Sequence, residues 1–181
     1  VTLCCVSDHV NAASNARTNG RILSLNKDSI ESVMNSDYFK QVRCEMKAGI
    51  EPRACTRCYD EERAGIKSKR QEENARYLEN SRVVIDSMLP DGTIPVDFRF
   101  IELRLGNICN LRCRTCNPVS SSRWISEYNK LQQELKFVTD YSGVEKGEWF
   151  EQDSFWDELL EKSTSLQRIY VNGGEPTMVK K

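Results

Sequence analysis

The residues best suited to chemistry are three cysteines, Cys109, Cys113 and Cys116, which lie close together in one short stretch. Thiolates at this spacing can bind three irons of a [4Fe–4S] cube from a single loop and leave the fourth iron without a protein ligand. An open metal position is where chemistry takes place, as in catalytic zinc sites with three protein ligands. The spacing therefore predicts a reactive iron–sulfur cluster.

A second motif suited to binding is Gly-Gly-Glu-Pro, formed by Gly173, Gly174, Glu175 and Pro176. The glycines leave room for a ligand to approach the backbone, and the glutamate offers a negative charge to an ammonium group. The proline stiffens the turn. Taken alone, the motif is typical of an ordinary turn at the end of a strand, and the upstream cysteines are what favour a binding role.

The segments around these motifs predict two strands with helices between them. Residues 98–105 are typical of a strand and lead straight into the cysteines. Residues 124–135 and 154–162 carry apolar side chains at helical spacing, with an interruption at residues 143–147. Residues 166–171 are again typical of a strand. This order predicts a βαβ unit with parallel strands, which brings both motifs to the carboxyl ends of those strands.

The two motifs together resemble those of the radical S-adenosylmethionine (SAM) enzymes. In that family, Cys-x3-Cys-x2-Cys follows the first barrel strand, and Cys109, Cys113 and Cys116 match it residue by residue. Residues 173–176 match the family's second motif, which receives the ammonium group of SAM. Thr115 departs from the family pattern, which usually has an aromatic residue here, so adenine contact at this position is left open.

The resemblance implies an enzyme with a [4Fe–4S] cluster and SAM as cofactors. Reductive cleavage of SAM would give a 5'-deoxyadenosyl radical that abstracts hydrogen from a substrate. A low-potential electron donor, such as a flavodoxin or ferredoxin, and a peptide or protein substrate are implied in the same way. Two other interpretations remain open: an electron-transfer cluster and a structural zinc site, with a fourth ligand from Cys44 or elsewhere.

A second set of thiols lies near the N-terminus. Cys55 and Cys58 form a Cys-x2-Cys pair, and Cys4 and Cys5 are adjacent in the sequence. The pattern of residues 55–70, preceded by a Cys-Cys pair, resembles the auxiliary-cluster modules called SPASM or twitch domains, although these usually follow the barrel. We expect a second iron–sulfur cluster here, or zinc, since spacing alone does not separate the two metals.

The N-terminal elements are predicted to be mostly helical. In residues 36–47, Phe39, Val42 and Met46 recur at helical spacing. Residues 60–80 are predicted to form one long, exposed helix that contains a single glycine. The Pro-Asp-Gly sequence at residues 90–92 predicts a turn and a domain boundary.

The predicted fold class is α/β: the start of a partial (β/α) TIM-like barrel, preceded by a small, mostly α-helical, cysteine-containing module. The module covers residues 1–92, and the first part of the radical SAM core covers residues 93–181. We expect the chain to be a fragment, because the later strands of such a barrel have no counterpart in it. Alone, it should be a poor enzyme.

Composition excludes several classes of function. The 181 residues carry a net charge of -1, which creates no overall field for nucleic acid or an anionic membrane. No apolar run approaches the roughly 18 residues of a membrane span. Eight cysteines in a charged chain of this length, without a secretion signal, favour a reducing compartment over a disulfide framework, so a cytoplasmic location is predicted.

Overall fold

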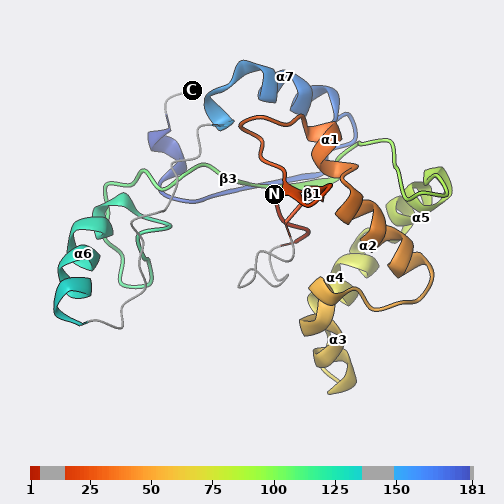
Figure 1. Ribbon diagram of the computed structural model, residues 1–181, viewed down its shortest axis with the longest axis horizontal. Coiled ribbons are helices and arrows are strands. Elements are labelled where there is room, and N and C mark those ends of the chain that lie inside the picture. Colours follow the sequence, from red (N-terminus) through yellow and green to blue (C-terminus); the bar gives the residue numbers. More distant parts are fainter. Residues whose placement is uncertain (5–14, 136–148, 180–181) are drawn as a thin grey trace. The chain divides into compact units, whose positions relative to one another are not determined.

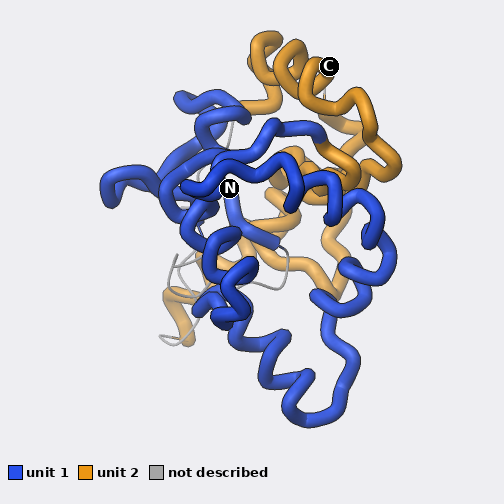
Figure 2. Tube along the Cα trace, turned by 90° about the vertical axis from the view of Figure 1, so that its right-hand side faces the viewer, with its two compact units in different colours: residues 1–97 blue, residues 98–181 orange. Residues whose placement is uncertain are grey.

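The structure, a computed structural model, describes residues 1–4, 15–135 and 149–179 (Figure 1). The chain divides into two compact units, residues 1–97 and 98–181, coloured blue and orange in Figure 2. The described part is mixed α/β, with seven α-helices and two sheets of two strands each. The mixed α/β class is thus confirmed. Cys5 and the predicted interruption at residues 143–147 lie outside the described residues.

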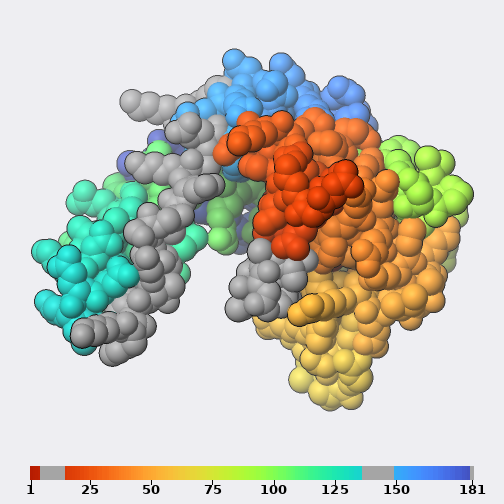
Figure 3. All heavy atoms as spheres, viewed as in Figure 1, coloured from red at the N-terminus to blue at the C-terminus, as the bar shows by residue number. Residues whose placement is uncertain are grey.

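Unit 1 consists of a small hairpin followed by helices, whose atoms form a continuous surface from orange to green in Figure 3. Its elements are β1 (Arg17–Thr18), β2 (Arg21–Ile22), α1 (Ile30–Met34), α2 (Asp37–Lys47), the 3-10 helix η1 (Arg53–Cys55), α3 (Thr56–Arg63), α4 (Lys69–Arg76) and α5 (Leu78–Ser87). The strands pair antiparallel. A cluster of Ala16, Leu23, Val33 and Phe39 forms a buried core beside them.

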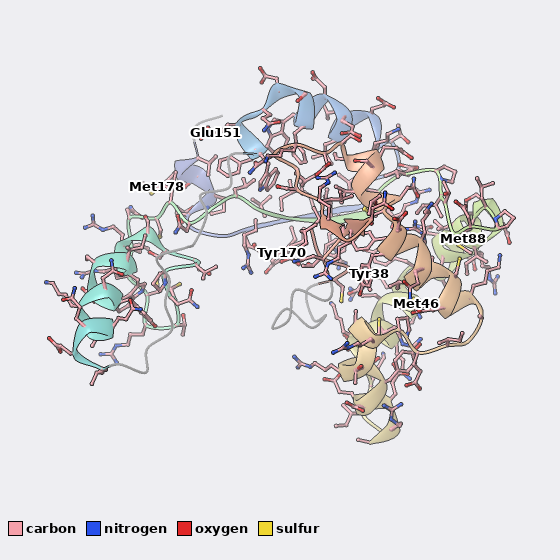
Figure 4. All side chains as sticks on the ribbon, viewed as in Figure 1. Tyr38, Met46, Met88, Glu151, Tyr170 and Met178 are labelled. Carbon is pink, nitrogen blue, oxygen red and sulfur yellow. The ribbon has the colours of Figure 1, made fainter. Side chains whose placement is uncertain are left out.

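Helix α2 confirms the prediction for residues 36–47, but only part of its apolar stripe is buried. Phe39 and Val42 are 3% and 2% exposed, whereas Met46 is 40% exposed. Met46 lies in the last turn of α2 and is labelled in Figure 4. The buried part of the apolar face therefore ends before the last turn of the helix, which is followed by Gly49 with a positive φ of 74°.

The single helix predicted for residues 60–80 is wrong, because the chain forms α3, α4 and α5 in this region. Gly65 adopts a positive φ of 75° after α3, and the N–H of Ile66 donates to the carbonyl oxygen of Glu61. This is how a glycine ends a helix. The next helix, α4, is capped at its N-terminus by Ser68, whose hydroxyl accepts from the N–H of Gln71 in a capping box.

Unit 2 contains a parallel pair of strands with helices between them in the sequence. Its elements are β3 (Phe100–Arg104), η2 (Ser122–Trp124), α6 (Ile125–Glu134), η3 (Trp149–Glu151), α7 (Asp153–Glu161), β4 (Arg168–Asn172) and η4 (Pro176–Met178). Phe100 pairs with Arg168 and Arg104 pairs with Asn172. The predicted parallel pairing of the two strands is confirmed.

The core of unit 2 is small. Leu103 and Leu105 are buried, as are Phe150, Phe155 and Leu159 of the α7 region. By contrast, residues 168–171 of β4 are exposed, including Tyr170, which is labelled in Figure 4. Among the described residues, no helix combines the length and apolar character that crossing a membrane requires.

Candidate functional site

The carboxyl ends of β3 and β4 bring the two predicted motifs of unit 2 to the same sheet edge. Arg104, the last residue of β3, lies opposite Asn172, the last residue of β4. The ladder extends one step further, since the N–H of Leu105 donates to the carbonyl oxygen of Asn172 at 3.0 Å. Residues 106–118, here called the cysteine loop, and residues 173–176, here called the glycine turn, therefore start at the same level.

The glycine turn touches the beginning of the cysteine loop through its backbone. The N–H of Glu175 donates to the carbonyl oxygen of Ile108 at 2.7 Å, and the N–H of Gly174 donates to that of Ser120 at 3.1 Å. Gly173 and Gly174 have positive φ values of 83° and 52°. A Cβ on Gly174 would lie 2.3 Å from the carbonyl oxygen of Ile108, so only glycine permits this approach.

The side chain of Glu175 is held by the residue that follows Pro176. One carboxylate oxygen of Glu175 accepts from the N–H of Thr177 at 3.2 Å and from its hydroxyl at 2.8 Å. These hydrogen bonds lower the pKa of Glu175. Pro176 begins η4, a position that suits its fixed φ. Glu175 is therefore an oriented negative charge, and its other carboxylate oxygen has no hydrogen bond to a described residue.

The three cysteines of the loop are accessible free thiols. Cys113 is exposed, and Cys109 and Cys116 are half-buried. The N–H of Cys116 donates to the carbonyl oxygen of Cys113 at 3.0 Å, and the sulfur of Cys109 accepts from the N–H of Leu111 at 3.4 Å. Within the described ranges, no three His, Cys, Asp or Glu side chains gather closely enough to hold a metal ion. The predicted ligand roles of these cysteines stay predictions.

Side chains at both ends of the cysteine loop form hydrogen bonds with its backbone. The Asn107 amide donates to the carbonyl oxygen of Pro118 at 2.8 Å, and the Ser121 hydroxyl donates to that of Leu111 at 2.7 Å. The indole N–H of Trp124 donates to the carbonyl oxygen of Cys113 at 3.1 Å. Asn107 was not among the predicted site residues. Its place between a strand and a cysteine motif could have indicated a side chain that supports the loop.

The structure also shows the surroundings of two other residues of the cysteine loop. Arg112 forms an ion pair with Glu127 of α6, so its charge is partly compensated within unit 2. Thr115, which departs from the family pattern, is exposed. It has no hydrogen bond or ring contact with the rest of the described chain that would give it a structural role.

In unit 1, Cys55 and Cys58 are buried where η1 leads into α3. Burial raises the pKa of the Cys55 thiol to about 11, and the nearby Cys4 and Cys58 thiols act in the same direction. Cys4 and Cys58 are thus close enough to Cys55 to influence it, although the three do not form a metal-binding group in the described conformation. Cys5, the fourth predicted member, lies outside the described residues.

A network of charged and polar side chains stabilises α3, the helix of unit 1 that carries Cys58. The Glu62 carboxylate accepts from the hydroxyl of Ser68 at 2.5 Å and from Nε of Arg70 at 3.1 Å. The Arg70 guanidinium lies over the Tyr59 ring, 4.4 Å from its centre. Since Tyr59 follows Cys58 directly, this network joins the start of α4 to the turn of α3 that carries the thiol.

Cys44 is separate from this network. Its half-buried sulfur donates to the carbonyl oxygen of Pro90 at 4.0 Å. Nothing in its described surroundings connects it with either set of predicted ligands.

No protein-family model, curated protein or solved structure matches this chain. No disulfide joins the described cysteines, and thiols are the donors that iron–sulfur clusters use. The glycine turn packs its backbone directly against Arg104 and Ile108, where a Cβ would overlap them. In donor chemistry, the thiols of the cysteine loop fit a cluster, and the glycine turn places the Glu175 carboxylate near its start.

Proposed function

We propose that unit 2 carries the cluster-binding and SAM-binding motifs of a radical SAM enzyme. The observation that supports this most directly is the contact between the glycine turn and the cysteine loop at Ile108, one residue before Cys109. Two motifs that are far apart in the sequence would need this proximity if they served one cofactor. Neither a zinc site nor an electron-transfer cluster has a use for it.

In this proposal, Cys109, Cys113 and Cys116 hold a [4Fe–4S] cluster. When bound, the cluster supplies the electron that cleaves SAM into methionine and a 5'-deoxyadenosyl radical, which takes a hydrogen atom from the substrate. Gly173 and Gly174 allow the turn to lie against Arg104 and Ile108, and the oriented carboxylate of Glu175 is suited to the ammonium group of SAM.

The remaining residues of the site act by positioning. Asn107 and Trp124 restrain the loop on both sides of Cys109, which lowers the entropy lost when its thiols converge on a cluster. Pro176 holds the entry to η4, and so keeps the Glu175 carboxylate beside Thr177.

We further propose that Cys4, Cys5, Cys55 and Cys58 hold a second iron–sulfur cluster or zinc. Cys55 and Cys58 are buried together where η1 leads into α3, and Cys4 lies close enough to influence Cys55, which supports this assignment. The other parts of the proposal follow from the resemblance: a partial (β/α) barrel, a peptide or protein substrate, a flavodoxin or ferredoxin as electron donor, and a cytoplasmic location.

Anaerobic reconstitution with iron and sulfide, followed by electron paramagnetic resonance of the reduced protein with and without SAM, tests the proposal. We expect a cluster signal that shifts when SAM is added. Cys113→Ala should abolish the SAM-sensitive signal and lower the iron content by about four atoms per chain. Cys44→Ala is the matched control and should change neither.

Two results would contradict the proposed SAM chemistry and indicate a different function. A signal that is indifferent to SAM would indicate an electron-transfer cluster. Zinc in place of iron at the Cys109–Cys113–Cys116 set would indicate a structural site.

A further inference from the structure

We propose that unit 1 contains a binding site for a carboxylate group, in a cavity beside α2 and η1. The cavity has a volume of about 280 Å³. Its apolar lining includes the buried residues Val42 and Ala54. Its polar lining consists of Arg17, Tyr38, Gln41, Glu45 and Arg53.

The charges of this lining favour a single negative charge. Among the described lining residues, two carry guanidinium groups, Arg17 and Arg53, and one carries a carboxylate, Glu45. One oxygen of that carboxylate already accepts a hydrogen bond from the Gln41 amide at 2.7 Å. Positive groups thus outnumber negative ones by one in this described lining, which suits a monoanion better than a dianion such as phosphate.

Arg53 is the group best able to bind such an anion. It is exposed, and its guanidinium has no hydrogen bond or ion pair with any described residue. A guanidinium presents planar pairs of N–H donors that match the two oxygens of a carboxylate. Arg53 is therefore a donor available at the edge of the cavity.

Tyr38 adds a neutral donor. It lies on α2, where Figure 4 labels it, and it is half-buried. Burial raises the pKa of Tyr38, and nearby Cys55 and Glu45 act in the same direction. The phenol thus keeps its proton at neutral pH, and its O–H can donate a hydrogen bond to a bound oxygen.

The size of the cavity limits what it holds. Pockets for small molecules usually measure about 300–1,000 Å³, so this one lies at the lower limit. It can take one carboxylate with a few attached carbons, which is the size of an amino acid side chain or chain terminus. A nucleotide would not fit inside it.

This inference goes beyond the proposed function and does not rest on it, because the cavity is formed by unit 1 alone. The test uses the full chain without iron or SAM, with ¹⁵N-detected NMR titrations. The probes are N-acetylalanine and its amide, which has the same shape but no carboxylate. We expect saturable shifts at Tyr38 and Ala54 with the acid only.

Two single substitutions test which positive charge binds the carboxylate. Arg53→Gln should weaken binding of N-acetylalanine by about tenfold or more, because a charge-assisted hydrogen bond is lost. Arg57→Gln removes an equal charge from α3, outside the cavity, and should change the affinity less than about twofold. Circular dichroism of each variant verifies that it is folded.

A third probe, the amide of N-acetylaspartate, carries its carboxylate on the side chain. Tighter binding of this probe would assign an acidic side chain as the natural ligand group, and tighter binding of N-acetylalanine would assign a chain terminus. Equal affinity for N-acetylalanine and its amide, equal losses in Arg53→Gln and Arg57→Gln, or tighter binding of inorganic phosphate would each overturn the proposal.

Discussion

The N–H of Glu175 donates a hydrogen bond to the carbonyl oxygen of Ile108, with a nitrogen–oxygen distance of 2.7 Å. This bond joins the turn after β4 to the residue that precedes Cys109. It forms because β3 and β4 are parallel and in register, so that both chains leave the sheet at the same level. The first two predictions concern this contact and the loop that it supports.

Gly174→Ala should separate the glycine turn from the cysteine loop. The added Cβ would lie 2.3 Å from the carbonyl oxygen of Ile108, and the backbone has a positive φ of 52°. Strain and overlap together should destabilise unit 2 by about 2–5 kcal/mol. Urea denaturation measures the loss of stability, and a SAM titration of the reconstituted protein should show weaker binding.

Gly106→Ala is the matched control for that substitution. Gly106 also has a positive φ, of 65°, but a Cβ there would meet only the Phe150 ring at an ordinary distance of 3.5 Å. We expect a loss of about 1–2 kcal/mol, from the backbone conformation alone. Equal losses in the two variants would show that the close approach of residues 174 and 108 has no energetic consequence.

Trp124→Phe should loosen the cysteine loop without disturbing the rest of unit 2. It removes the indole N–H that donates to the carbonyl oxygen of Cys113 at 3.1 Å. The cost should be about 0.5–1.5 kcal/mol, and Cys113 should react faster with iodoacetamide. Trp156→Phe removes a similar bond, to the carbonyl oxygen of Phe150 at 2.8 Å, and should leave the reactivity of Cys113 unchanged. A similar acceleration in both variants would contradict a local role for Trp124.

Glu62→Gln should weaken the network that braces α3 against α4. The carboxylate accepts from Ser68 and Arg70, and its side chain is only 14% exposed. Loss of its charge should cost about 1–2 kcal/mol and increase alkylation of the buried Cys58. Glu61→Gln, which disrupts only the exposed pair with Arg57, should cost less than about 0.5 kcal/mol. If alkylation of Cys58 is the same in both variants, the network does not protect the thiol.

Asp91 should make stability depend on pH in the acid range. Hydrogen bonds from the N–H and hydroxyl of Thr93, and one from Lys40, lower the pKa of Asp91 to about 2 from the ordinary 3.8. Because the folded state holds the carboxylate ionised, this contribution is present above pH 3.8 and is lost as the pH falls towards 2. Carbon-detected NMR should give a midpoint near 2, and Thr93→Val should raise it. If Asp91 titrates in the folded protein with a midpoint at its ordinary 3.8, it makes no such contribution to stability.

Several features of the fold could be predicted from local patterns alone. The strand at residues 98–105, the helix at residues 36–47 and the parallel pairing with β4 follow from periodicity and from the order of elements. The long helix at residues 60–80 was predicted wrongly. The break depends on Gly65 and on the capping box at Ser68, two local signals that outweigh the helical propensity of the charged residues around them.

The chemical groups can be read directly from the sequence: thiols at cluster spacing, and a glycine turn with a carboxylate. Three relationships could be seen only in the fold: Ile108 meets Glu175, Asn107 and Trp124 hold the cysteine loop, and Arg17 and Arg53 line one cavity. The physical reason is that spacing governs contacts within a turn or a helix, whereas contacts between distant segments depend on strand register and on packing.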